Sequence, residues 1–151
     1  MKLSTKGRYG LKAMFDLAIN HGNGPVSLTI IAERQNISVN YLEQLISPLR
    51  KNDLVKSVRG AQGGYLLARD PKEISVGDIL KVLEGPLAPT SCVVTDSEEC
   101  AQAEYCVTRI IWDKMKKSID EVVDTTTLQD MIDDYERMRK PDQTLQKENC
   151  K

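Results

Sequence analysis

Three of the four cysteines fall in one short segment, SCVVTDSEECAQAEYC, which runs from residue 91 to residue 106. Cys92, Cys100 and Cys106 have the spacing C-x7-C-x5-C, whereas Cys150 lies apart from them near the end of the chain. Thiolates are soft ligands for metals such as iron and zinc, and two thiols within reach of each other can form a disulfide. Zinc sites usually have closer C-x2-C pairs and an evident fourth ligand. The segment therefore predicts a metal site or a thiol–disulfide switch.

The rest of the sequence indicates the cellular compartment of the protein. The chain of 151 residues has no run of about eighteen apolar residues, and its start, MKLSTKGRYG, lacks the apolar stretch of a secretory signal. We therefore expect a cytoplasmic protein with no membrane partner. Thiols are mostly reduced in that compartment, so the cysteine cluster is expected to bind metal or sense redox state rather than to crosslink the fold.

The net charge of −1 conceals an uneven distribution of charged residues. Residues 1–60 contain nine Lys and Arg against four Asp and Glu, whereas residues 61–151 contain twelve against eighteen. The first part is therefore basic and the second part acidic. A basic N-terminal part predicts contact with a polyanion such as double-stranded DNA, although chance could also produce the asymmetry.

The spacing of apolar residues predicts three helices within residues 4–51, each preceded by a Ser or Thr that can cap it. Pro48 is expected to bend the third helix or to end it early. A tight turn at residues 35–36 separates the second helix from the third, which is typical of a helix-turn-helix motif. The third helix would bury Leu42 and Leu45 and present a polar face that suits base edges, unless that face is simply solvated. The residues of this face are Asn40, Tyr41, Glu43 and Gln44.

Two β-strands are predicted at residues 54–58 and 65–68, with the loop RGAQGG between them. The three glycines of this loop can take positive φ and lie close to another backbone. Arg59, at the base of the loop and beside Gly60, is suited to a minor groove, where the negative potential is concentrated. An ordinary β-turn is the alternative, but the preceding helix-turn-helix motif favours a DNA-binding wing.

The whole chain divides into four predicted parts. Residues 1–84 would form a winged helix-turn-helix domain, residues 85–102 the cysteine-containing loop, and residues 103–139 the dimerisation helices. Residues 140–151 show no apolar periodicity and are expected to be disordered, so Cys150 is a poor ligand candidate. The predicted fold class is mainly α with a small β-wing and a long dimerisation helix.

An apolar stripe on the long helix predicts a homodimer. Its residues recur at three- and four-residue steps, and such a stripe can pack on its own domain or on a second chain. A second copy is favoured, because one winged helix reads a short site and paired half-sites extend it. The stripe consists of Ile111, Met115, Ile119 and Val122.

The sequence gives no sign of an enzyme. His21 is the single histidine, and its setting in HGNGP suits a helix end better than a catalytic base. No phosphate-binding glycine loop and no pair of nucleophile and base are visible. We therefore expect a binding protein.

Three blocks of the sequence resemble one family of bacterial regulators. The blocks are MKLSTKGRYGLKAM, ISVNYLEQLISPLRKNDLV and VRGAQGGYLLARDP, and the resemblance extends over about residues 1–139. The family is that of the winged-helix regulators that include IscR, CymR and NsrR. The resemblance implies a homodimer crossed by long helices, with DNA contacts from the third helix and the wing. The positions it implies are Ser38, Asn40, Tyr41, Glu43, Gln44, Arg59 and Gly60, with Lys6, Arg8 and Tyr9 near the DNA backbone.

Members of that family like IscR hold an iron–sulfur cluster with three cysteines that lie between the fourth helix and the dimer helix. The resemblance therefore implies a cluster, expected to be [2Fe-2S], on Cys92, Cys100 and Cys106. Members like IscR complete the site with a histidine three residues after the third cysteine, but this chain has Arg109 there, which cannot be a ligand. The candidates for the fourth ligand are Glu104, His21 and a residue of the other chain.

Three functions stay open at this point. The first is a regulator that senses iron–sulfur cluster or redox status and controls genes of cluster biogenesis. The second is a CymR-like repressor of cysteine metabolism without a cluster, because the N-terminal blocks also match members like CymR, which lack these cysteines. The third is a small iron–sulfur electron carrier, in which the helix-turn-helix motif and the wing would have no purpose. The cysteine loop favours the first.

Overall fold

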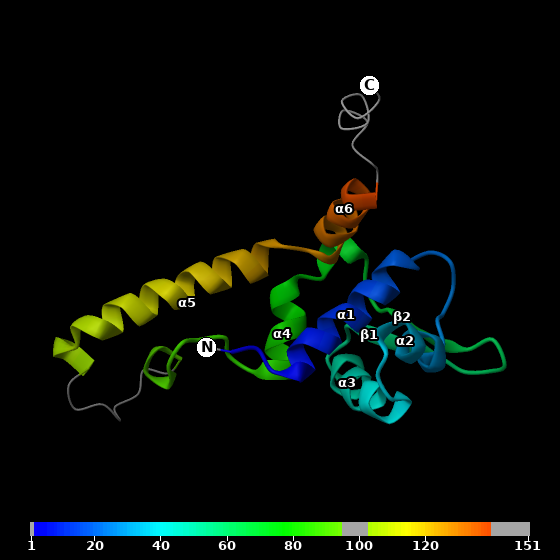
Figure 1. Ribbon diagram of the computed structural model, residues 1–151, viewed down its shortest axis with the longest axis horizontal. Coiled ribbons are helices and arrows are strands. Elements are labelled where there is room, and N and C mark those ends of the chain that lie inside the picture. Colours follow the sequence, from blue (N-terminus) through cyan, green and yellow to red (C-terminus); the bar gives the residue numbers. More distant parts are fainter. Residues whose placement is uncertain (1, 95–102, 140–151) are drawn as a thin grey trace, which may run out of the picture.

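The computed structural model describes residues 2–94 and 103–139, which form helices and one small antiparallel sheet (Figure 1). The prediction of a mainly helical fold with a small β-wing is confirmed. The α-helices in this part of the chain are α1 (Thr5–Ile19), α2 (Leu28–Gln35), α3 (Val39–Lys51), α4 (Val76–Glu84), α5 (Val107–Thr125) and α6 (Leu128–Arg139). The strands are β1 (Val55–Val58) and β2 (Gly64–Leu67), and the short 3-10 helices are η1 (Pro71–Glu73), η2 (Ser91–Val93) and η3 (Ala103–Tyr105).

The core of the N-terminal domain forms around α1, which contacts α2, α3, α4, α6 and β2. Met14 and Ala13 of α1 are fully buried and pack with Ile31 of α2 and Leu42 of α3 in one hydrophobic cluster. Burial of these apolar side chains is the main source of the domain's stability. The cluster therefore fixes the two helices of the helix-turn-helix motif on a common support.

Serine side chains cap the N-termini of the two helices of the helix-turn-helix motif. Ser27 Oγ accepts the N–H of Ile30 at the start of α2, and Ser38 Oγ accepts the N–H of Tyr41 at the start of α3. Asn36 closes α2 in the left-handed conformation, with φ of 54°, which gives the tight turn of the motif. These features confirm the predicted caps of α2 and α3 and the turn between them, whereas Ser4, at the N-cap position of α1, makes no side-chain capping bond.

The expectation that Pro48 ends the third helix early was wrong, because α3 continues to Lys51. Pro48 lies in the last turn of α3, where the missing N–H removes one helical hydrogen bond rather than a series of them. Asn52 then caps the helix end, since both its backbone N–H and its side-chain amide donate to the Pro48 carbonyl oxygen, at 3.1 and 2.8 Å. The last turn is therefore stabilised in spite of the proline.

The wing is an antiparallel hairpin in which Val55 pairs with Leu67 and Val58 with Gly64. Tyr65 also exchanges two backbone hydrogen bonds with Val26, at 2.8 and 2.9 Å, which joins the hairpin to the segment before α2. Gly64 lies so close to the Val26 carbonyl oxygen that a Cβ would come within 2.4 Å of it. The predicted close approach of a loop glycine to another backbone is thus confirmed at this position.

The C-terminal helices take two different courses. Figure 1 shows α5 extending away from the winged domain and α6 returning beside α1, where Tyr135 packs edge-on against Phe15 with ring centroids 5.5 Å apart. The helix predicted from about residue 103 begins instead at Val107, because residues 103–105 form the separate turn η3 and Cys106 occupies the N-cap position. Within the described ranges, no helix is both long and apolar enough to cross a membrane.

Candidate functional site

The third helix has one buried face and one exposed face. Leu42, Leu45 and Ile46 are at most 1% exposed and anchor α3 in the core. Anchoring one side of a helix fixes which side chains the other side offers to a ligand. The polar residues Asn40, Glu43 and Gln44 are all exposed, as the sequence analysis expected.

Tyr41 differs from its neighbours on α3. Its hydroxyl is buried and has no hydrogen-bond partner among the described residues, and its ring packs edge-on against Tyr9, with centroids 6.1 Å apart. Lys12 Nζ lies 5.3 Å from the centre of the Tyr9 ring. The expectation that Tyr41 points outward is therefore not met in this conformation, where it joins the start of α3 to α1.

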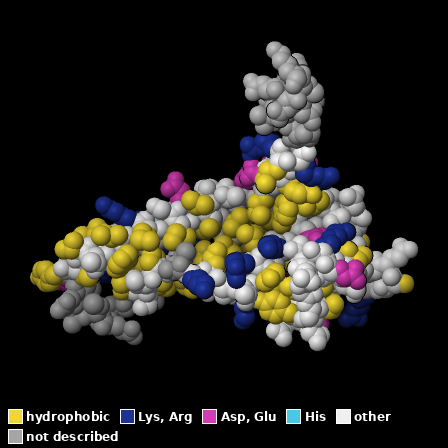
Figure 2. All heavy atoms as spheres, in the orientation of Figure 1, with side chains coloured by type: hydrophobic (Ala, Val, Ile, Leu, Met, Phe, Trp, Pro, Cys, Tyr) yellow, Lys and Arg dark blue, Asp and Glu magenta, His cyan; other side chains and the backbone are white. Residues whose placement is uncertain are grey.

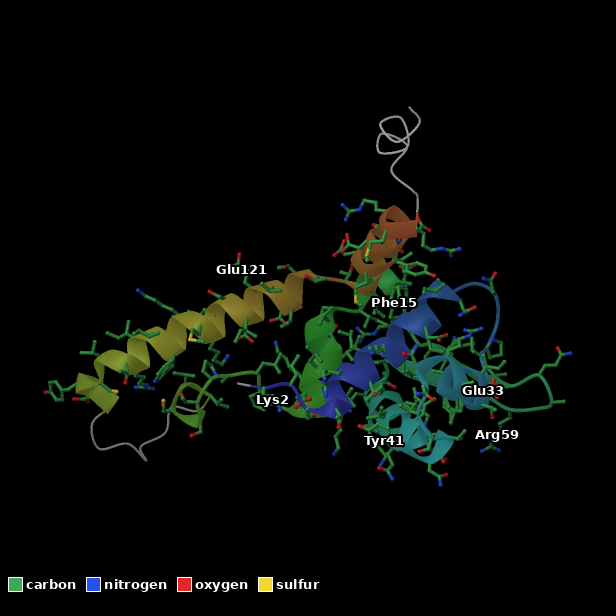
Figure 3. All side chains as sticks on the ribbon, viewed as in Figure 1. Lys2, Phe15, Glu33, Tyr41, Arg59 and Glu121 are labelled. Atoms are coloured by element: carbon green, nitrogen blue, oxygen red, sulfur yellow. The ribbon has the colours of Figure 1, made fainter. Side chains whose placement is uncertain are left out.

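Arg59 and Gly60 are exposed at the start of the wing loop, directly after β1. Gly60 has φ of 115°, a conformation that favours glycine, and its carbonyl oxygen accepts the N–H of Gly63 at 3.0 Å to close the turn. Figure 3 shows Arg59 on the same lower edge of the molecule as Tyr41 of α3. In this view, the wing arginine and α3 lie along one edge of the molecule.

The start of α1 is held by a carboxylate that the sequence analysis did not anticipate. Glu84 Oε1 accepts the backbone N–H groups of Ser4 and Gly7, at 2.9 and 3.0 Å, and also the Ser4 hydroxyl. A negative charge at a helix N-terminus is favourable for the helix dipole. Lys6 and Arg8 are exposed on this same turn, so Glu84 fixes the helix end from which both extend.

Helix α4 connects this turn with α5. At one end it presents Glu84 to α1, and along its length Lys81 Nζ bonds both carboxylate oxygens of Asp124 on α5, at 2.7 and 2.9 Å. The bond to Asp124 is the main cause that raises the pKa of Lys81 above its usual value. The chain then passes from Glu84 through Gly85 toward Cys92. Helix α4 is thus in contact with α1 and with α5, and it precedes the cysteine segment in the chain.

Two of the three clustered cysteines lie in the described residues. Cys92 is in η2, Cys106 is at the N-cap position of α5 without a side-chain capping bond, and both thiols are free and half-buried. Their sulfur atoms lie 3.0 Å from Thr90 Oγ1 and 3.2 Å from Thr108 Oγ1 respectively. The hydrogen bond with Thr108 is the main cause that lowers the pKa of the Cys106 thiol, which favours the thiolate that a metal needs. Cys100 and Cys150 lie outside the described residues, as do residues 140–151.

The candidates for a fourth ligand are placed differently. Glu104 lines the same cavity as Cys106, about 480 Å³ in volume, together with Arg109 and Asp113. His21 lies at the far end of α1 and lines a different cavity, at the base of the wing. Within one chain, Glu104 is therefore the better placed of the two. In the described ranges, no group of three or more His, Cys, Asp or Glu residues has the geometry of a metal site.

Arg109 contacts the cysteine loop directly. Its Nη2 donates to the carbonyl oxygen of Cys92 at 3.2 Å, and η2 packs against α5. Arg109 thus touches the segment that carries Cys92.

The apolar stripe predicted on the long helix is mostly exposed. Ile111, Met115 and Val122 are 51%, 42% and 63% exposed, whereas Ile119 packs inward against the cluster formed by α4 and Val123. Val107 and Ile110, which the sequence analysis did not name, are also exposed. Figure 2 shows hydrophobic side chains along this arm of the molecule. The stripe is thus exposed at Ile111, Met115 and Val122 and partly packed at Ile119.

Comparison with known proteins identifies the family. A family model described as "Rrf2: Iron-dependent Transcriptional regulator" matches residues 3–134. The HTH-type transcriptional regulator CymR of Bacillus subtilis is 51% identical over 131 residues, which are 87% of this chain and 89% of that protein. The HTH-type transcriptional regulator IscR of Sodalis glossinidius is 43% identical over 136 residues, 90% of this chain and 81% of that protein.

Solved structures give the same result. A structure described as T. potens IscR has a TM-score of 0.79 and 53% sequence identity, and the match covers 96% of both chains. The structure of CymR, the global cysteine regulator of B. subtilis, has a TM-score of 0.74 and 49% identity, with 87% of this chain and 95% of that chain covered. The chain therefore belongs to the Rrf2 family of winged-helix transcriptional regulators, which bind DNA.

Proposed function

We propose that this regulator is a homodimer that senses iron–sulfur cluster or redox status through Cys92, Cys100 and Cys106, and that it controls genes of cluster biogenesis. The observation that carries the proposal is the placement of Cys92 and Cys106. The first lies in η2, which packs against α5, and the second directly precedes that same helix, so two free thiols flank one contact between loop and helix. Three thiolates suit iron, which favours soft sulfur ligands.

The donor set fits such a group in part. Cys92 and Cys106 would hold it together with Cys100, and Glu104 is the candidate for a fourth ligand that shares the cavity of Cys106. A carboxylate is a harder ligand than a thiolate or an imidazole, so a cluster held in this way is expected to be released readily. When bound, the group supplies a redox-sensitive chromophore.

A route from the cysteines to DNA follows from the contacts of α4. This helix precedes the cysteine loop, is paired with α5 through Lys81, and holds the first turn of α1 through Glu84. A change in the loop would shift the pose of α4, and thereby the DNA-facing groups that the same core supports. The affinity for DNA would then differ between the two states of the loop.

DNA recognition is assigned to groups of α3, the wing and the start of α1, which are exposed except for the half-buried Tyr9 and Tyr41. The proposed set is Ser38, Asn40, Tyr41, Glu43, Gln44, Arg59 and Gly60 for the grooves and Lys6, Arg8 and Tyr9 for the backbone. Ser38 Oγ accepts a capping bond, which leaves its hydroxyl proton free to donate. Tyr41 would have to rotate away from Tyr9 to reach DNA, and its buried hydroxyl without a partner makes that rotation less costly.

The second chain is proposed to pack on the exposed row of α5. Ile111, Met115 and Val122 would be covered there, and Ile119 would serve mainly its own chain. A two-fold dimer places two copies of α3 on paired half-sites, which lengthens the DNA sequence that is read.

The proposal is tested by anaerobic purification and reconstitution with iron and sulfide. We expect bound iron and sulfide, visible absorption, and a different DNA affinity with and without the cofactor. Cys92→Ser and Cys106→Ser should remove the absorption, because each takes away a soft ligand, whereas Cys150→Ser is the matched control and should keep it. A colourless wild-type protein that binds operator DNA equally in both preparations would overturn the proposal.

The alternative function is that of a CymR-like repressor of cysteine metabolism with no cluster. Two observations favour it: the 51% identity to CymR of B. subtilis, and an arginine at the position where members like IscR have a histidine ligand. The colourless outcome of the reconstitution experiment supports this alternative.

Replacing Glu43 with alanine is expected to broaden the choice of DNA sequence. A carboxylate facing the bases can accept a hydrogen bond from the cytosine amino group and disfavours groups that present acceptors. The measurement is selection from randomised half-sites, followed by affinities for the ranked sequences. Glu33→Ala is the matched control, because Glu33 is an exposed carboxylate on α2. Equal weakening on every sequence would show that Glu43 does not discriminate.

A further inference from the structure

Arg109 joins the two halves of the cysteine site. It lies in the first turn of α5, it is half-buried, and its guanidinium donates to the backbone of Cys92, seventeen residues earlier in the chain. It also lines the cavity that contains Cys106 and Asp113. Of the five N–H groups of the guanidinium, one makes this bond, so others are available to acceptors in the cavity.

The bond to the Cys92 carbonyl matters because of what it connects. The segment of η2 has one internal backbone hydrogen bond, from Val94 to Ser91 at 3.1 Å, and no buried residue. Such a short 3-10 turn is weak by itself. A charge-assisted hydrogen bond from Arg109, on a helix of nineteen residues, adds to the packing of this segment against α5.

We propose that Arg109 is a positioning residue that anchors the Cys92 segment to α5 and keeps a positive charge beside the thiolates. The part of the proposal that concerns the charge beside the thiolates rests on the proposed function. The part that concerns the anchor rests only on the hydrogen bond between Arg109 and Cys92. A guanidinium cannot bind a metal, but it can fix the backbone of a ligand residue and stabilise negative charge on sulfur. The chain thus has a positioning group at the position where a ligand would otherwise stand.

The anchor is tested first in the reduced, metal-free protein by amide hydrogen exchange at Val94. Arg109→Ala is expected to raise the exchange rate about three- to tenfold, because loss of the anchor lets η2 open more often. Arg109→Lys should give an intermediate rate, since lysine keeps the charge without the planar fork. Lys114→Ala is the matched control, an exposed cation on the same helix, and should leave the rate unchanged. Far-UV circular dichroism confirms that each variant is folded.

The charge is tested second in the reconstituted protein. Arg109→Ala should move the midpoint potential to more negative values, because the reduced cofactor carries more negative charge, whereas Arg109→Lys should stay near the wild type. A wild-type protein that takes up no iron defeats the proposed function, but the exchange experiment still tests the anchor. Equal exchange at Val94 in wild type and Arg109→Ala, or an equal rise in Lys114→Ala, overturns the anchor.

Discussion

Replacing Arg59 with alanine is expected to weaken binding to specific DNA by about 1–3 kcal/mol, the usual cost of losing an arginine contact to bases or to a groove. This corresponds to a loss in affinity of roughly 5- to 150-fold. Arg59 is exposed beside the turn that Gly60 and Gly63 close, and it takes part in none of the salt bridges formed by the described residues. A narrow groove concentrates negative potential and so rewards an inserted guanidinium.

The measurement is a gel-shift titration at one fixed salt concentration, because the affinity of basic proteins for DNA depends strongly on salt. Arg69→Ala is the matched control, since Arg69 is exposed and follows the other end of the hairpin. Its loss should have a much smaller effect. An Arg59→Ala protein that binds operator DNA as tightly as the wild type would remove the wing from the DNA-binding surface.

The helices and the hairpin of the winged helix-turn-helix domain could be predicted well, because the sequence patterns that indicate them are local. Serines at positions 27, 38 and 75 mark helix starts, and each of these side chains accepts a backbone N–H three residues later. The loop glycines indicate the hairpin, since φ above zero is costly for other residues. Apolar spacing locates Leu42 and Leu45 in the core, where both are found. Each of these patterns depends only on neighbours in the sequence.

The parts that sequence reasoning missed depend on contacts across the chain. Glu84 bonds the start of α1 from eighty residues away, and Arg109 reaches back to Cys92. The periodic spacing of apolar residues does not predict hydrogen bonds between such distant positions. A weak signal did exist for the first, because Gly7 and Gly10 lie on one face of α1 and would clash with Glu84 and Leu83 if either carried a Cβ. Small residues three apart on a helix indicate that another element approaches closely.

Two wrong or unmet expectations have a common physical cause. Proline was expected to disrupt the helix, and polar residues of α3 were expected to face outward. Both expectations hold best for the middle of a helix, whereas Pro48 and Tyr41 lie near the ends of α3. At the C-terminal end of α3, Asn52 supplies bonds that compensate for the proline. At its N-terminal end, the side of the helix turns toward α1, so Tyr41 packs on Tyr9 rather than facing solvent. Helix ends meet different neighbours from those of the helix middle.

Replacing Leu42 with alanine is expected to lower the free energy of unfolding by about 2–5 kcal/mol, because Leu42 is fully buried and the smaller side chain leaves a cavity. The adjacent substitution Glu43→Ala is the matched control and should change stability by no more than about 0.5 kcal/mol, since Glu43 is an exposed surface residue. Denaturant unfolding at one protein concentration measures both, because the stability of the proposed dimer would depend on concentration.

The pair also separates folding from DNA recognition. Leu42→Ala should lose stability and lose affinity for all DNA sequences together, as the support under α3 weakens, whereas Glu43→Ala should change sequence choice alone. If Leu42→Ala lowered the free energy of unfolding by less than about 1 kcal/mol, the burial of Leu42 in the hydrophobic cluster would be contradicted. The exposed face of α3 would then no longer be fixed in direction, and the assignment of Asn40, Glu43 and Gln44 to the DNA grooves would lose its basis.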